Sequence, residues 1–150
     1  MRKETFFLTD TTQKLENKIL SENENDFDEL INDFNDKIVD MTLSDYLHDL
    51  LSKYNLTKKE IFANAGIDPV YGYQIFNGTK KKPSRDLLLL LAFSFPLSID
   101  ETRHLLYYGH CEDLYARNRR DAYIMFSLHN KYSLIKTNIY LAKNDLKPIC

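Results

Sequence analysis

The sequence predicts an all-α protein, and three observations lead to this fold class. Apolar residues recur at helical spacing along most of the chain, and Ser, Thr or Asp precedes several of these stretches as a candidate N-cap. Gly and Pro number only four each, so few tight turns are available for a β-sandwich. The 150 residues, 43% hydrophobic and 28% charged, have the composition of a soluble globular domain with room for short appendages.

Residues 1–40 are expected to form an acidic helical leader. The spacing of apolar residues predicts one short helix over Thr11–Leu20 and a second from Phe27 to Ile38, separated by a polar break. This segment holds 11 acidic and 5 basic residues, a balance of −6, whereas residues 41–150 hold 11 acidic and 15 basic, a balance of +4. A locally basic unit behind an acidic leader favours an anionic partner for the rest of the chain.

Five further helices are expected between residues 41 and 110. The first begins at Leu43, with apolar residues at i, i+3, i+4, i+7 and i+8. Thr57 and Glu60 form a capping box that opens the second, and Asp68 with Pro69 opens the third. The predicted helices cover residues 43 to about 55, 58–65, 69–76, 85–93 and 99–108.

The last two of these helices recur near the C-terminus, at an offset of 35 residues. Arg85-Asp86 recurs as Arg120-Asp121, and the capping residue Ser98 recurs as Ser133. Each copy reads as a helix, a short loop and a Ser-capped helix. We therefore expect residues 111–150 to form a C-terminal helical extension whose hairpin packs on the first one.

The stretch from Leu56 to Pro83 carries the functional prediction. Two short helices flank a turn that contains Gly66, which is the spacing of a helix-turn-helix. Its diagnostic residues are Leu56, Ile61, Ala65-Gly66-Ile67, Ile75, Asn77-Gly78, the basic loop that follows and Pro83. On these residues the stretch resembles the lambda-repressor-like helix-turn-helix family, also called the XRE or Cro/C1 type, and a bacterial subgroup of it with a C-terminal helical arm.

This resemblance implies a lambda-repressor-like five-helix domain over residues 41–110 that binds double-stranded DNA sequence-specifically in a bacterial transcriptional regulator. In such domains the exposed face of the third helix enters the major groove. The residues at the implied base-facing positions are Asp68, Pro69, Val70, Tyr71, Tyr73 and Gln74. Gln74 is the strongest candidate because its amide can pair bidentately with adenine, and Val70 suits a thymine methyl group.

The phosphate-binding positions implied by the resemblance are Lys58, Thr79, Lys80, Lys81 and Lys82. Lys58 stands where related domains usually carry Gln, and it still suits a phosphate as a point charge. Phe62 stands where a small Ala usually lies between the two helices, and Gly72 where a core aliphatic residue is common. We therefore expect Gly72 to admit close packing against the bulky Phe62.

The same residues have simpler interpretations that the sequence leaves open. Tyr71, Tyr73 and Gln74 can be ordinary surface or partly buried residues, and Lys80–Lys82 can be a solvated turn. The alternative function is a non-catalytic adaptor, in which the aromatic third helix binds a protein partner. A further hypothesis is that the acidic leader covers the basic loop and weakens DNA binding.

A second basic cluster comprises Arg117, Arg119 and Arg120. It lies in the loop before the repeated hairpin, where it can touch DNA phosphates outside the main site. A structural role is favoured, in which Arg120 and Asp121 cap and pair as Arg85-Asp86 does.

Other classes of function find little support. The sequence has no G-x-x-x-x-G-K-[ST], G-x-G-x-x-G or G-x-S-x-G motif, so we expect neither an enzyme nor a cofactor. His104, His110, Cys111 and Glu112 lack the ligand pairs of a zinc site, so no metal is expected. No apolar run approaches 18 residues and no signal peptide is visible, which predicts a cytoplasmic protein with two free thiols, Cys111 and Cys150, and no membrane partner. One helix-turn-helix reads few bases, so a homodimer is expected.

Overall fold

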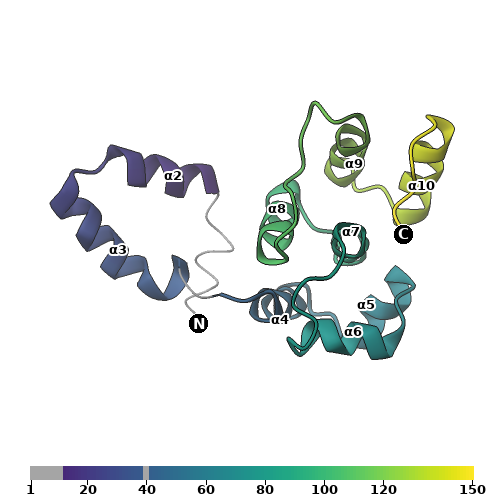
Figure 1. Cartoon of the computed structure of the whole chain (residues 1–150), viewed down its shortest axis with the longest axis horizontal. Helices are drawn as coiled ribbons and strands as arrows, with labels where there is room; N and C mark the ends of the chain where they lie inside the picture. The colour runs from purple at the N-terminus through teal and green to yellow at the C-terminus, as the bar shows by residue number, and fades with distance from the viewer. Residues whose placement is uncertain (1–11, 39–40) are drawn as a thin grey trace. The chain divides into compact units, whose positions relative to one another are not determined.

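The computed structural model describes residues 12–38 and 41–150, and every regular element in those ranges is a helix (Figure 1). The predicted all-α class is therefore confirmed. The chain divides into two compact units, with the division after Thr42. None of the helices in the described ranges is long and apolar enough to cross a membrane.

The first unit contains α2 (Thr12–Ser21) and α3 (Glu24–Ile38). The second of these helices begins earlier than predicted because the Asn23 carboxamide oxygen accepts a hydrogen bond from the Asp26 backbone N–H at 2.9 Å. None of the described side chains in these two helices is buried. Leu20 is 76% exposed, and the apolar residues of α3 with described side chains, Phe27, Leu30 and Ile31, are half-buried.

The second unit runs from Leu43 to Cys150. Its helices are α4 (Leu43–Tyr54), α5 (Lys58–Ala65), α6 (Pro69–Phe76), α7 (Arg85–Ser94), α8 (Ile99–Tyr108), α9 (Arg119–His129) and α10 (Leu134–Lys143). Both predicted capping boxes are present, at Thr57 with Glu60 and at Ser98 with Glu101. The predicted bounds are accurate because these caps are local signals.

Helix α7 forms the centre of this unit. It packs on α5, α8 and α10, and every residue from Leu87 to Ser94 is buried. Figure 1 shows α4, α5 and α6 on one side of α7 and the α9–α10 hairpin on the other. The predicted Leu-rich core segment is therefore confirmed, and it joins the two halves of the unit.

The internal repeat is confirmed by matching contacts in the hairpins α7–α8 and α9–α10. The Arg85 guanidinium donates to the carbonyl groups of Glu112 and Asp113 at 3.0 and 3.1 Å. Arg120, 35 residues later, donates to the carbonyl groups of Lys147 and Pro148 at 2.8 and 3.1 Å. Each arginine thus ties the first helix of its hairpin to the segment that follows the second helix.

The same two arginines join the hairpins to each other. Arg85 forms a bidentate pair with Asp121, and Arg120 forms one with Asp86, with the donor–acceptor distances between 2.9 and 3.0 Å. The predicted pairing of each Arg with its neighbouring Asp is therefore wrong. The partners are exchanged between repeats because the starts of α7 and α9 face each other across the hairpin interface.

Helix α4 covers the outer face of α8. The Tyr46 hydroxyl donates to the Glu101 carbonyl group at 3.1 Å, and the Lys53 ammonium group lies 2.6 Å from the Glu101 carboxylate, which also accepts from the Tyr54 hydroxyl. Burial alone would raise the pKa of Glu101, but the hydrogen bonds that its carboxylate accepts from Lys53, from the Ser98 backbone N–H and from Tyr54 hold that pKa below its usual value. The ionised side chain of Glu101 therefore joins the first hairpin to α4.

Candidate nucleic-acid interface

Helices α5 and α6 are joined by a turn whose conformation follows from its sequence. Gly66 ends α5 with φ of +67°, a left-handed conformation that glycine adopts without a Cβ penalty. The Asp68 carboxylate then accepts a hydrogen bond from the Tyr71 backbone N–H at 3.2 Å, and Pro69 occupies the first turn. Asp68 therefore has a capping role in addition to the base-facing position predicted for it.

Gly72 allows α6 to lie close to α5. A Cβ atom at this position would stand 2.5 Å from Cε1 of Phe62, which is closer than real carbon contacts. The Phe62 ring cannot easily yield, because it packs edge-on against the rings of Tyr73 and Phe76, at centroid distances of 5.1 and 5.4 Å. The predicted close packing of Gly72 against the bulky Phe62 is confirmed.

One face of α6 is left open by this packing. Val70 is 68% exposed and Tyr73 is 48% exposed, while Ile75 and Phe76 on the other face are buried. Of the remaining predicted base-facing residues, Pro69 and Gln74 are exposed and Tyr71 is half-buried. The predicted residues thus lie along one short helix with their side chains largely available to a partner.

Basic residues stand at both sides of this face. The Lys58 ammonium group lies 6.0 Å from the Tyr73 ring centroid, and that of Lys80 lies 5.6 Å from the Tyr71 ring centroid. These are cation–π distances. The sequence analysis did not predict these two lysine–tyrosine contacts, because each joins residues of different elements. The only sign of them in the sequence is that lysines and tyrosines occur together in this stretch.

The basic loop is tied to the end of α6. The Lys80 backbone N–H donates to the Gln74 carbonyl group and that of Thr79 to the Asn77 side chain, both at 2.9 Å. The side chains from Thr79 to Lys82 are all exposed. The backbone of Thr79 and Lys80 is therefore fixed at the end of α6, and the three lysine side chains that follow α6 are open to solvent.

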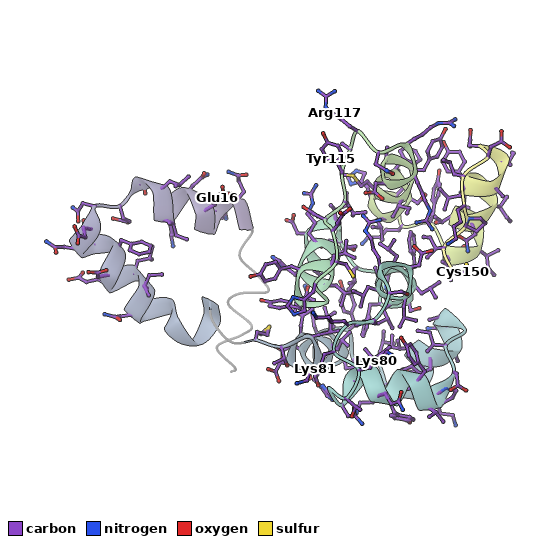
Figure 2. The ribbon with its side chains drawn as sticks, in the orientation of Figure 1. Glu16, Lys80, Lys81, Tyr115, Arg117 and Cys150 are labelled. Atoms are coloured by element: carbon purple, nitrogen blue, oxygen red, sulfur yellow. The ribbon has the colours of Figure 1, made fainter. Side chains whose placement is uncertain are left out.

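The second basic cluster does not join this surface. Arg120 is held by Asp86, and Arg119 lies 5.9 Å from the Tyr123 ring centroid. Figure 2 shows Arg117 at the end of the second unit away from Lys80 and Lys81. The favoured structural role is confirmed for Arg120, although through a different partner than predicted.

The other residues that the sequence singled out are placed as follows. His104 is buried, and burial lowers its pKa. His110 is exposed and Cys111 is half-buried; Cys111 and Cys150 are both free thiols. Within residues 12–38 and 41–150, no three His, Cys, Asp or Glu side chains gather as metal ligands.

Comparison of the chain with protein-family models, curated proteins and solved structures finds no match. The function of the α5–α6 face is therefore inferred from the chemistry of its own residues.

Proposed function

We propose that residues 43–109 form a lambda-repressor-like helix-turn-helix domain that binds double-stranded DNA sequence-specifically, with α6 in the major groove. The observation that carries this proposal is the open face of α6 with lysines on both sides. Val70 and Tyr73 are exposed on the helix, Lys58 borders it from α5, and Lys80–Lys82 follow it. A short exposed helix between cations fits a groove between two phosphate backbones.

The side chains of α6 suit the edges of base pairs. Gln74 offers an amide donor and acceptor that match adenine, and Val70 offers an apolar surface for a thymine methyl group. Tyr71 and Tyr73 carry hydroxyl groups that can donate to phosphate oxygens. Each hydroxyl belongs to a ring that lies beside a lysine ammonium group, so two donors of different kinds are available at each side of α6.

The backbone of this region also favours phosphate. The N-terminal end of a helix carries partial positive charge and unpaired N–H groups. In α5 the capping box already binds one of these N–H groups, and in α6 the Asp68 carboxylate accepts a hydrogen bond from another. The lysine side chains therefore supply most of the attraction to the DNA backbone, and they fix register and orientation on the duplex.

A domain of this kind serves a transcriptional regulator, and two copies reading two half-sites would raise specificity. The alternative is a non-catalytic adaptor whose α6 binds a protein. The exposure of Val70 and Tyr73 suits that function too, because aromatic residues are enriched at protein interfaces. Phosphate binding imposes a steep dependence on salt, so salt titration separates the two functions.

The test is fluorescence anisotropy with duplexes from the DNA upstream of the protein's own coding sequence, between about 50 and about 300 mM salt. If each protomer touches four phosphates, the slope of log K against log salt is about −3.6 per protomer. Replacement of Lys80, Lys81 and Lys82 by Ala removes up to three of these contacts and should flatten the slope to about −0.9.

A matched control removes the same charge elsewhere, through Lys14→Ala, Lys18→Ala and Lys147→Ala. This control variant should keep the wild-type slope. Absence of binding, or binding that does not change in the Lys80–Lys82 variant, would contradict the proposal and favour the adaptor.

A further inference from the structure

The repeat reveals a difference between the outer faces of α8 and α10. On α8 this face is covered by α4: His104 is 8% exposed, its ring centroid lies 6.1 Å from that of Tyr46, and Glu101 binds Lys53. Helix α4 packs on α6 and α8, whereas α10 packs on α9 and α7. The equivalent face of α10 thus lacks this covering helix among the described residues.

The residues of the open face are known from the 35-residue offset. Ile139 stands at the position of His104 and is 57% exposed; Ile135, one turn earlier, is 75% exposed. Lys136 stands at the position of Glu101, and Lys143 at that of Tyr108. This face of the second hairpin is therefore apolar and is bordered by the two lysines along one side. Where the first hairpin carries the acidic Glu101, the second carries the basic Lys136.

No described acidic side chain forms an ion pair with Lys136 or Lys143. The Lys136 ammonium group lies 3.9 Å from the Tyr132 ring centroid instead, at the edge of the same face. A helix that packs here as α4 packs on α8 would bring its flanking residues to these two lysines. Its apolar stripe must therefore be bordered by carboxylates.

Helix α3 has this chemistry. Phe27, Leu30 and Ile31 share one side of the helix and are only half-buried in their own unit. Asp26 and Asp28 adjoin Phe27 in sequence and thus lie about 100° away from it on either side of the helix. Both carboxylates are exposed.

We propose that the outer face of α10 binds α3 of a second copy of this chain, and that the exchange is reciprocal and forms a two-fold dimer. A second copy is chosen because every chain carries both surfaces, so that two copies can satisfy both α3 helices and both α10 faces in one closed, two-fold exchange. This proposal does not depend on DNA binding.

The experiment is sedimentation equilibrium of the full chain, from about 1 to about 200 μM, with two charge-reversed variants. One variant carries Lys136→Glu with Lys143→Glu, and the other carries Asp26→Lys with Asp28→Lys. All four side chains are exposed, so helical circular dichroism and the melting temperature of the second unit should stay at wild-type values. The wild type should dimerise, and each variant alone should dissociate at least about tenfold more readily, because attraction becomes repulsion.

An equimolar mixture of the two variants is the decisive sample. Each α3 then meets an α10 of opposite charge in the other chain, so dimers should return to within about threefold of the wild-type dissociation constant. A control with Lys59→Glu and Arg117→Glu, which has the same net charge as the α10 variant and changes only exposed side chains, should dimerise as the wild type does.

Three outcomes would overturn the proposal. A wild type that stays monomeric over the whole range has no such interface. Dimers that persist in either reversed variant arise through another surface. The third outcome is a mixture that stays monomeric while a single chain with all four substitutions dimerises as the wild type does. In that case α3 contacts α10 within one chain.

Discussion

The two helical hairpins share their internal architecture and differ in what covers them. In both, an arginine ties the first helix to the segment after the second, and a threonine hydroxyl of the second helix donates to the capping serine carbonyl group at 2.8 Å. The first hairpin is covered by α4, which packs on α8, and by α5, which packs on α7, whereas the second leaves one face of α10 open. The comparison teaches that the repeated contacts determine the fold of each hairpin, while the substituted outer residues determine its partner.

The exchanged Arg–Asp pairs should give the largest effect. Asp121→Ala removes a carboxylate that is 6% exposed and leaves Arg85 without its bidentate partner, so we expect a loss of about 3 kcal/mol in the free energy of unfolding. Asp86 is 16% exposed, and Asp86→Ala should cost less, about 1.5 kcal/mol. Urea unfolding of both variants measures the difference. Costs below about 0.5 kcal/mol in both variants would show that the pairs do not stabilise the hairpin interface, and equal costs would contradict the effect ascribed to burial.

The C-cap residues that follow α8 and α10, Gly109 and Asn144, sharpen the comparison. A Cβ atom at Gly109 would stand 2.2 Å from the buried Leu88, so Gly109→Ala should destabilise the protein by about 2 kcal/mol. The equivalent residue, Asn144, already has a side chain, which donates to the Tyr140 carbonyl group at 2.9 Å, and Asn144→Ala should cost about 0.5–1 kcal/mol. Thermal unfolding compares the two. In a Leu88→Ala background the cost of Gly109→Ala should nearly vanish, and a cost that stays unchanged would rule out this packing contact.

Glu101 on α8 and Lys136 on α10 occupy equivalent positions, and their contributions to the free energy of unfolding should differ in pH dependence. The folded pKa of Glu101 lies below its usual value of 4.5, so its stabilisation is present above pH 4.5 and is lost as the pH falls through the folded pKa. Glu101→Gln should therefore cost about 1 kcal/mol at pH 7 and approach zero cost in acid. Lys136→Gln, at the equivalent exposed position, should leave the stability of the monomer unchanged at both pH values. A Glu101→Gln cost that does not change with pH would contradict the ionised role of this residue.

The starts of helices could be predicted wherever the capping residues lie within a few positions of each other in the sequence. Asp68 with Pro69 and the Thr57–Glu60 box are visible in the sequence, and the helices that they open begin at the predicted residues. The repeat was also visible, but the exchange of partners was not, because Arg85 and Asp121 are 36 positions apart and only the tertiary packing brings them together. The lysine–tyrosine contacts beside α6 have the same origin. Sequence patterns report neighbours within one helix, whereas these pairs depend on how helices cross.

The most direct test of the function is backbone-amide NMR of the protein during titration with a duplex that it selects from a random pool. DNA binding by the α5–α6 face predicts shifts at Lys58, at Val70–Gln74 and at Thr79–Lys82. The amides of Leu134–Lys143, on the other side of α7, should keep their positions. Enrichment of no duplex from the pool, or shifts that concentrate on α10 and leave α6 unchanged, would contradict DNA binding by this face.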